Sequence, residues 1–196
     1  MVMAGRTWWW PTHVIQRTHR EDRQRRRYLR GAIHVSHFAG SLPVAIADLN
    51  GDGRPDVVTA DRGSNTAGVR LGIGNGTLAS RVDVAVGASP YGVAIADLNA
   101  DGKPDLATAN AGAGTVSVLL GHGDGTFDTR SDFTVGNSPR TVVIADLNAD
   151  GRPDLTTSNA GSNTVSVLLG NGDGQLRRRY RILQRDHIHT TSRSRI

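Results

Sequence analysis

The sequence predicts an all-β fold: a partial β-propeller of about three four-stranded blades in an open or incomplete ring, with irregular or disordered basic termini. Two observations predict it. A unit of sequence recurs every 49 residues, and each unit holds short apolar runs separated by Gly, Pro, Asp or Asn. Propeller blades are four-stranded units that repeat about every 40 to 50 residues. The 196 residues include no Cys, which excludes a disulfide framework and a thiolate zinc site.

The repeat is clearest in an Asp-rich loop that occurs three times. The loop reads Asp-Leu-Asn-Gly/Ala-Asp-Gly-Arg/Lys-Pro-Asp and begins at Asp48, Asp97 and Asp146. The similarity extends beyond the loop, because residues 88–125 and 137–174 align without gaps with 28 identities in 38 positions. This extent of similarity does not arise by chance, so three copies of one structural unit are expected.

Four strands are predicted in each unit. In the second unit they are the apolar runs 93–96, 106–109, 116–120 and 127–135, each bounded by residues that favour turns. A helix is disfavoured because Gly, Pro and Asn interrupt the sequence repeatedly, and the first two cost a helix roughly 1–3 kcal/mol each.

The repeats also define the predicted domains. The repeat region spans residues 41–174, with units at about 41–87, 88–136 and 137–174. A basic irregular segment over residues 1–40 precedes it and contains a candidate remnant strand at 33–40. A basic tail, either disordered or non-native, follows at 175–196. Three units do not close a ring that needs about 4 to 8 blades, so self-association to complete a ring is one expectation.

Charge is segregated along the chain. Residues 1–40 and 175–196 hold 15 of the 23 basic residues against 3 acidic ones, whereas residues 41–174 hold 8 basic residues against 15 acidic ones. The formal net charge of +5 therefore averages an acidic middle and basic ends. No apolar stretch reaches the roughly 18 residues of a membrane span, so none is predicted.

The Asp-rich loops have the donor set of a calcium site. Positions 1, 3, 5 and 9 are Asp, Asn, Asp and Asp, and position 6 is a Gly that permits a left-handed turn. Ca²⁺ takes about six to eight oxygen ligands and offsets the repulsion among three carboxylates. Position 7 would add its backbone carbonyl. The predicted metal ligands are Asp48, Asn50, Asp52, Arg54 and Asp56; Asp97, Asn99, Asp101, Lys103 and Asp105; and Asp146, Asn148, Asp150, Arg152 and Asp154.

The same loop residues are open to other interpretations. Hairpin turns rich in Asp, Asn and Gly form without any metal. An EF-hand shares the first half of the pattern but needs a bidentate Glu at position 12, where Thr59, Thr108 and Thr157 stand. Mg²⁺ fits less well because it usually keeps several waters. A second Gly-rich segment, at 121–125 and 170–174, lacks the Lys-Ser/Thr of a phosphate loop and is predicted to be a hairpin turn.

These residues carry a resemblance to a known family. The segments Ser89-Pro90, Val93 to Asp105, Val116 to Gly121 and Gly123 to Phe127 together resemble the FG-GAP/VCBS-type repeat, over about residues 41–174. The resemblance implies a propeller like that of integrin alpha subunits and of large bacterial surface and secreted proteins, with Ca²⁺ in the loops. It further implies an extracellular or cell-surface scaffold for binding or adhesion. The sequence departs from the family in having three units, a degraded first unit at 69–76 and no visible secretion signal.

The basic ends are open to three interpretations. Arg clusters at 23–27 and 177–181 are typical of an arm that binds nucleic acid or another polyanion. They are equally typical of a disordered tail without a specific role. The abrupt change of composition after Gly174 is also what an out-of-frame translation looks like.

The repeat region predicts a binding module and no enzyme. It contains one His, His122, and neither Cys nor Glu, so paired nucleophile and base groups are missing. The favoured function is a calcium-binding scaffold with a protein or glycan ligand, as a fragment of a larger surface or secreted protein. The alternatives are a nucleic-acid or polyanion binder with Arg-rich tails, which the acidic middle disfavours, and a truncated piece without independent function.

Overall fold

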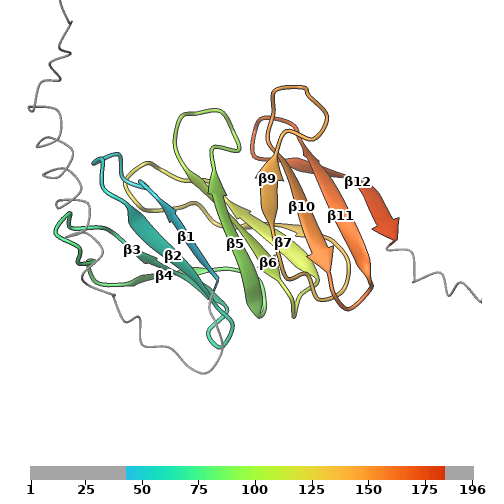
Figure 1. Ribbon diagram of the computed structural model, residues 1–196, viewed down its shortest axis with the longest axis horizontal. Coiled ribbons are helices and arrows are strands. Elements are labelled where there is room, and N and C mark those ends of the chain that lie inside the picture. The colour runs from blue at the N-terminus through green and yellow to red at the C-terminus, as the bar shows by residue number, and fades with distance from the viewer. Residues whose placement is uncertain (1–42, 184–196) are drawn as a thin grey trace, which may run out of the picture.

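The computed structural model describes residues 43–183, which form twelve β-strands and no helix (Figure 1). The strands make three four-stranded antiparallel sheets, none of which closes into a barrel. The predicted all-β fold of about three four-stranded blades in an open arrangement is therefore confirmed. Within this range, no helix long and apolar enough to cross a bilayer is found.

Each sheet contains four consecutive strands, and we call the sheets blades 1, 2 and 3. Blade 1 comprises β1 (Val44–Ala47), β2 (Asp56–Asp61), β3 (Thr66–Arg70) and β4 (Val82–Ala85). Blade 2 comprises β5 (Pro90–Ala96), β6 (Asp105–Asn110), β7 (Thr115–Leu119) and β8 (Ser131–Thr134). Blade 3 comprises β9 (Val143–Ala145), β10 (Asp154–Asn159), β11 (Thr164–Gly170) and β12 (Leu176–Leu183).

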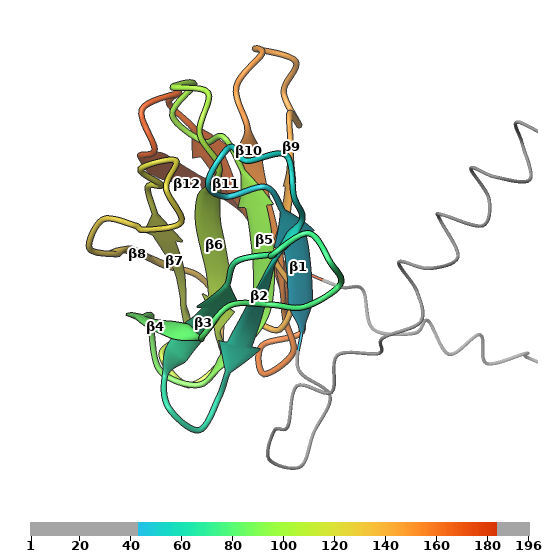
Figure 2. The ribbon, with the colours of Figure 1, turned by 90° about the vertical axis from the view of Figure 1, so that its left-hand side faces the viewer.

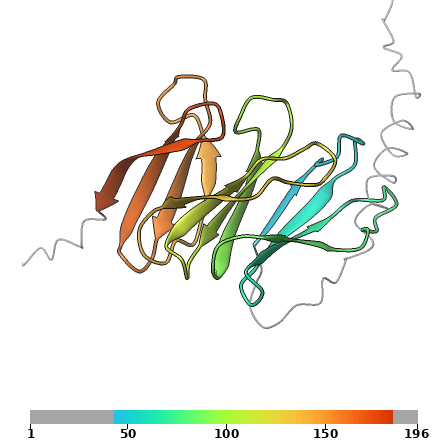
Figure 3. The ribbon, with the colours of Figure 1, turned by 180° about the vertical axis from the view of Figure 1, so that it is seen from behind.

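The blades stand side by side with their first strands together. β5 contacts both β1 and β9, and these three strands lie toward the viewer in Figure 1. The fourth strands, β4, β8 and β12, lie on the opposite side, which Figure 3 shows. Figure 2 views the stack from the side of blade 1. Neighbouring propeller blades have this arrangement, with their innermost strands around a central channel.

The fourth strand of blade 2 is shorter than predicted. The sequence predicts a strand over 127–135, whereas β8 spans Ser131–Thr134. Phe127 instead forms an isolated bridge with Gly121, and the N–H of His122 donates to the carbonyl of Thr126 at 3.0 Å. These contacts close the Gly-rich segment as a hairpin turn, so the strand starts only after the turn.

The predicted boundary after residue 174 differs from the structure. Residues 176–183 form β12, which pairs with β11 and completes blade 3. An Arg-rich run predicts a tail, but pairing with a sheet edge uses backbone N–H and C=O groups that these residues carry like any others. The Arg cluster at 23–27 and the candidate strand at 33–40 lie outside the described residues, as does the tail from 184 onward.

Apolar side chains pack between the blades. The cluster between blades 1 and 2 includes Val58, Ala67, Val69, Leu106 and Leu119, with Val93 and Ile95 packed against it. The cluster between blades 2 and 3 includes Ala107, Val116, Val118, Leu155 and Leu168, with Ala94 and Ile144 packed against it. We call the face of a blade that is directed at the preceding blade its proximal face, and the other its distal face. The blades are thus held together by nearest-neighbour contacts.

Candidate metal centre

The three Asp-rich loops emerge at the same end of the blades, the upper end in Figure 1. They occupy residues 48–55, 97–104 and 146–153, between the first two strands of each blade. Antiparallel pairing, such as that of Ala47 with Asp56, holds the two ends of a loop next to each other. Positions 1 and 9 of each loop are therefore neighbours in space.

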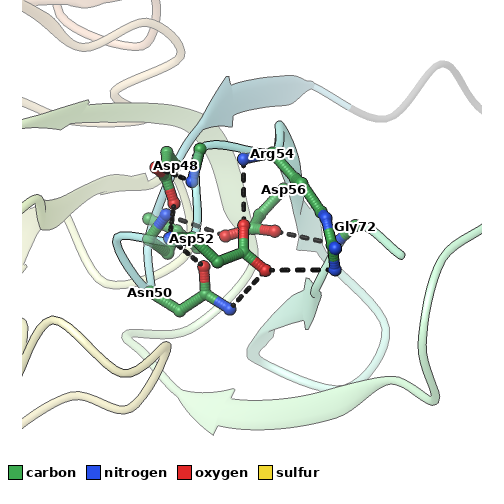
Figure 4. A network of polar contacts seen from close by, with 8 residues as sticks. Asp48, Asn50, Asp52, Arg54, Asp56 and Gly72 are labelled. Atoms are coloured by element: carbon green, nitrogen blue, oxygen red, sulfur yellow. Dashed lines mark hydrogen bonds and ion pairs between the residues drawn. The ribbon is translucent and has the colours of Figure 1, made fainter. Parts of the chain in front are cut away.

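In the first loop, the side chains at positions 1, 3 and 5 bind the backbone of the loop itself (Figure 4). The carboxylate of Asp48 accepts hydrogen bonds from the N–H groups of Asp52, at 3.2 Å, and Gly53, at 2.7 Å. Oδ1 of Asn50 accepts from the same Asp52 N–H at 3.2 Å, and Asp52 accepts from the Arg54 N–H at 2.9 Å. Oxygen atoms of positions 1 and 3 thus converge on one point.

The same contacts recur in the other two loops. Asp97 and Asn99 share the N–H of Asp101, at 3.2 and 3.1 Å, and Asp101 accepts from the N–H of Lys103 at 2.9 Å. The equivalent distances in the third loop are 3.3, 2.9 and 2.9 Å. The three loops therefore have one conformation.

Two positions of each loop have a left-handed backbone. The sequence predicts this at position 6, where Gly53 has a φ of 78° and its equivalents have 82° and 80°. Position 4 is left-handed as well, and there Ala100 and Ala149 each have a φ of 60°. An L-residue in this conformation is strained by roughly 1–2 kcal/mol. Sequence reasoning missed position 4 because Ala gives no signal of such a turn.

Position 9 is held differently from the other predicted ligands. Asp56 is fully buried, and its two oxygens accept backbone N–H groups of Leu49 and Gly72, each at 2.7 Å. The equivalent pairs are Asp105 with Leu98 and Gly121, and Asp154 with Leu147 and Gly170, at 2.7–2.9 Å. This carboxylate joins the loop to the segment after the third strand. The signal in the sequence is a Gly that follows each of these Asp residues by 16 positions.

The carboxylates of a loop differ in their pKa. The backbone N–H of Lys103 lowers the pKa of Asp101 below its usual value, and the N–H of Gly151 lowers that of Asp146. Burial raises the pKa of Asp105, and the nearby carboxylates of Asp101 and Asp97 raise it further against the effect of its two N–H donors. A cation in the loop would relieve this repulsion.

The donor chemistry of the loops fits Ca²⁺. Each loop offers three carboxylates and one amide oxygen, all hard donors, and a carboxylate has about four acceptor sites, so the N–H contacts leave free lone pairs. Within residues 43–183, however, no group of three or more His, Cys, Asp or Glu side chains already stands in a metal-binding arrangement. Calcium binding therefore stays a prediction, and it requires the carboxylates of a loop to move closer together. This holds for all the predicted ligands, including the backbone carbonyls of Arg54, Lys103 and Arg152.

A comparison with protein families identifies the repeat. A family described as FG-GAP-like repeat matches residues 48–108 and 97–157. Each match runs from one Asp-rich loop through the next, and together they cover all three loops and more than half of the chain. No curated protein matches the chain.

Several solved structures resemble the chain at low identity. A Photorhabdus luminescens Tc holotoxin pore matches 74% of this chain and 7% of its own length, with 19% identity and a TM-score of 0.42. BBS1N, in a complex with ARL6DN, matches 76% of this chain and 57% of its own, with 15% identity and a TM-score of 0.43. The V. cholerae biofilm matrix protein Bap1 matches 72% and 28%, with 19% identity and a TM-score of 0.38. The chain thus spans less than two thirds of each.

Proposed function

Because the chain belongs to the FG-GAP-like repeat family, we propose that it is a calcium-binding module of an extracellular or cell-surface protein that binds a protein or glycan partner. The observation that carries the proposal is the threefold recurrence of one loop conformation. In all three loops, the oxygens at positions 1 and 3 meet at the N–H of position 5.

The side chains at positions 1, 3 and 5 hold the ion in this proposal, and position 9 fixes the loop to the sheet. When bound, Ca²⁺ supplies positive charge that neutralises the clustered carboxylates and fixes the loop. A site filled at about 100 times its dissociation constant stabilises the folded state by roughly 2.7 kcal/mol. Calcium would thereby keep the exposed loops in one conformation at one end of the stack, as a surface for a partner.

We propose binding without catalysis. The residues that the structure describes contain one His, His122, whose Nε2 lies 3.3 Å from the Asp128 carboxylate, and neither Cys nor Glu. A nucleophile paired with a base, as hydrolytic sites require, is therefore not offered by this part of the chain.

Isothermal titration calorimetry with CaCl₂ tests the proposal on the full chain. We expect three calcium ions per chain, one for each loop, and two for Asp101→Ala. Asp173→Ala is a matched control, because Asp173 is an exposed turn Asp that accepts one backbone N–H at 2.9 Å, as Asp101 does. The control should keep three ions. No binding heat in the unaltered chain, or an unchanged stoichiometry in Asp101→Ala, would overturn the assignment.

A further inference from the structure

The proximal face of blade 1 exposes apolar side chains that the inner junctions bury. Val44 and Ile46 are 56% and 63% exposed. Their equivalents 49 residues later, Val93 and Ile95, pack into the cluster between blades 1 and 2. Val44 and Ile46 are therefore equivalent to junction residues but lie on a face that no other described blade covers.

The distal face of blade 3 has the same property. Leu147 is 50% exposed, whereas its equivalents Leu49 and Leu98 are each 2% exposed. Val143 is 53% exposed, whereas its equivalent Ala94 packs into the cluster between blades 2 and 3. The two ends of the stack thus present the two halves of a junction that the chain forms twice internally.

A close contact at the inner junctions shows how the halves fit. A Cβ on Gly125 of blade 2 would lie 2.9 Å from Leu71 of blade 1, and a Cβ on Gly174 of blade 3 would lie 2.7 Å from Leu120 of blade 2. The Gly-rich turn of each blade thus sits against a Leu of the blade before it. The equivalent turn residue in blade 1, Gly76, has no atom within 4 Å.

We propose that a second copy of the chain supplies the missing contact. The distal face of blade 3 in one copy packs on the proximal face of blade 1 in the other, so that Leu169, the equivalent of Leu71 and Leu120, covers the turn at Gly76. Two such head-to-tail junctions, related by a two-fold axis, close a ring. The described blades of two copies number six, within the about 4 to 8 of closed propellers.

The polar groups on the two faces already have partners inside their own blades. On blade 3, the hydroxyl of Thr156 donates to the backbone of β11 at 3.2 Å, and the hydroxyls of Ser158 and Thr141 pair at 2.8 Å. On blade 1, Arg81 pairs with Asp61 at 2.5 Å. Arg70, at the position of Leu119, donates from Nη1 to the carbonyl of Ala79 at 3.3 Å. These groups would keep their hydrogen-bond partners when the faces are covered, and the charge of Arg70 is the main penalty of the junction.

Sedimentation velocity of the full chain, with calcium in excess and again with a chelator, measures the assembly over a range of concentrations. We expect a species with the mass of two chains. Ile46→Glu on the proximal face and Val143→Glu on the distal face should each weaken the dimer by more than about tenfold in dissociation constant, because each buries an unpaired carboxylate. Both sites are exposed in the single chain, so both variants should keep the unfolding transition of the unaltered chain.

Ile73→Glu is the matched control. Ile73 is 49% exposed, but its equivalent His122 remains exposed even though blade 2 has a neighbour on each side. This position lies outside the junctions, so the control should dimerise like the unaltered chain.

Mixing the two interface variants distinguishes a head-to-tail junction from other contacts. The intact distal face of the Ile46→Glu chain can meet the intact proximal face of the Val143→Glu chain, so the mixture should recover a two-chain species. A single-chain mass at all concentrations would overturn the proposal, as would larger open assemblies or a dimer that either variant leaves intact. Ile46 and Val143 lie on strands and outside the Asp-rich loops, so a loss of the dimer in these variants is distinguishable from a loss of calcium binding.

Discussion

Blades 1 and 2 place different polar groups at the same point of the same fold. In blade 2, Asn110 and Ser117 are fully buried, and Nδ2 of Asn110 donates to the Ser117 hydroxyl at 2.7 Å. In blade 1 the equivalent residues are Asp61 and Gly68, and Arg81 lies over Gly68 to pair with Asp61 at 2.5 Å. A fully buried neutral pair thus occupies this point in blade 2, where Ser117 also donates to the carboxylate of Asp132, and an ion pair occupies the same point in blade 1.

The charged groups of both blades keep access to water. The side chain of Arg81 is 29% exposed, so its charge keeps part of its hydration. Deeper burial of the same charge would remove that hydration, which is costly even for a paired group. In blade 2 the equivalent Arg130 reaches across the junction, where its Nη1 donates to the carbonyl of Val86 in blade 1 at 2.9 Å. Arg130 also pairs with Asp132 at 3.0 Å, and its side chain is 39% exposed, so both Arg residues keep their charge near water while the neutral Asn110 and Ser117 are fully buried.

The largest effect should come from exchanging residues at one position of the two proximal faces. Leu119 is 1% exposed in the junction, and its equivalent Arg70 is half-buried, with Nη1 donating to the carbonyl of Ala79 at 3.3 Å. We expect Leu119→Arg to lower the free energy of unfolding by more than about 4 kcal/mol, because it buries a charge without a partner. Arg70→Leu should change it by less than about 1 kcal/mol. Urea unfolding followed by circular dichroism measures both.

If Leu119→Arg does not fold, Leu119→Ala and Arg70→Ala allow the same comparison of unfolding free energies at the two positions. Deleting most of a buried Leu side chain removes transfer free energy and leaves a cavity, for a loss of about 2–5 kcal/mol. Similar losses for Leu119→Ala and Arg70→Ala, at concentrations where the chain is single, would contradict the difference in burial between Leu119 and Arg70.

The second prediction concerns a feature that the two blades share. Asp56 and Asp105 are both fully buried and each accepts two backbone N–H groups. Asp56→Ala and Asp105→Ala should therefore lower the free energy of unfolding alike, by about 3 kcal/mol, because a buried N–H without a partner costs roughly 1–3 kcal/mol. Urea unfolding in chelator measures this loss without any contribution from calcium.

Position 5 provides the control for this prediction. Asp52 and Asp101 are exposed, and their hydrogen bonds stay within their own loop. In chelator, Asp52→Ala and Asp101→Ala should destabilise the chain much less than the variants of position 9. Equal losses at positions 5 and 9 would show that the buried carboxylate is not the main link between loop and sheet.

The sequence predicted what repeats locally and missed what depends on contacts across the chain. The strands and the Gly at position 6 follow from short patterns, and three aligned copies make those patterns unambiguous. Asp105 also joins its loop to the segment after the third strand, through a hydrogen bond from the N–H of Gly121. Gly121 is 16 residues away and comes close only when the strands pair. The Arg-rich composition also led to a wrong prediction for residues 176–183, which form β12 through backbone pairing with β11.

Burial of polar residues was equally hard to predict. Thr108 and Asn110 are fully buried in blade 2, yet their polarity alone predicts exposure. Their burial follows from the stacking of two sheet faces, and no pattern within one unit shows which faces are stacked. The exposed faces at the ends of the stack are visible only by comparing equivalent residues in the folded blades.

A third prediction exchanges the polar groups of the two blades. Asn110→Asp puts a carboxylate into the covered network near Asp132 and removes the donor to Ser117, so we expect a loss of about 2 kcal/mol in the free energy of unfolding. Asp61→Asn leaves Arg81 paired with Asp83 and should lose about 1 kcal/mol or less. Urea unfolding compares the two. A larger loss for Asp61→Asn would contradict the greater cost of placing a carboxylate at the fully buried Asn110.

The smallest predicted effect concerns acid sensitivity in the Gly-rich turns. Asp124 in blade 2 accepts hydrogen bonds from the hydroxyl and N–H of Thr126, at 2.6 and 2.9 Å. Asn75, its equivalent in blade 1, accepts the same two bonds from Thr77, at 2.6 and 3.0 Å, and cannot titrate. The hydroxyl of Thr126, followed by its N–H, lowers the pKa of Asp124 below the usual value.

The lowered pKa fixes the sign of the pH dependence. The folded chain binds a proton at Asp124 less readily than the unfolded chain, so ionised Asp124 stabilises the fold above the usual carboxyl pKa of about 3.9. That stabilisation is lost as the pH falls through the lowered value in the folded chain. Asp124→Asn keeps the acceptor and removes the titration. The difference in free energy of unfolding between the unaltered chain and Asp124→Asn, measured by urea unfolding, should therefore stay constant above the carboxyl range and shrink on acidification. Thr126→Val in both backgrounds removes the hydroxyl and should flatten this change. A difference that does not vary with pH would mean that the turn of blade 2 behaves like the uncharged turn of blade 1.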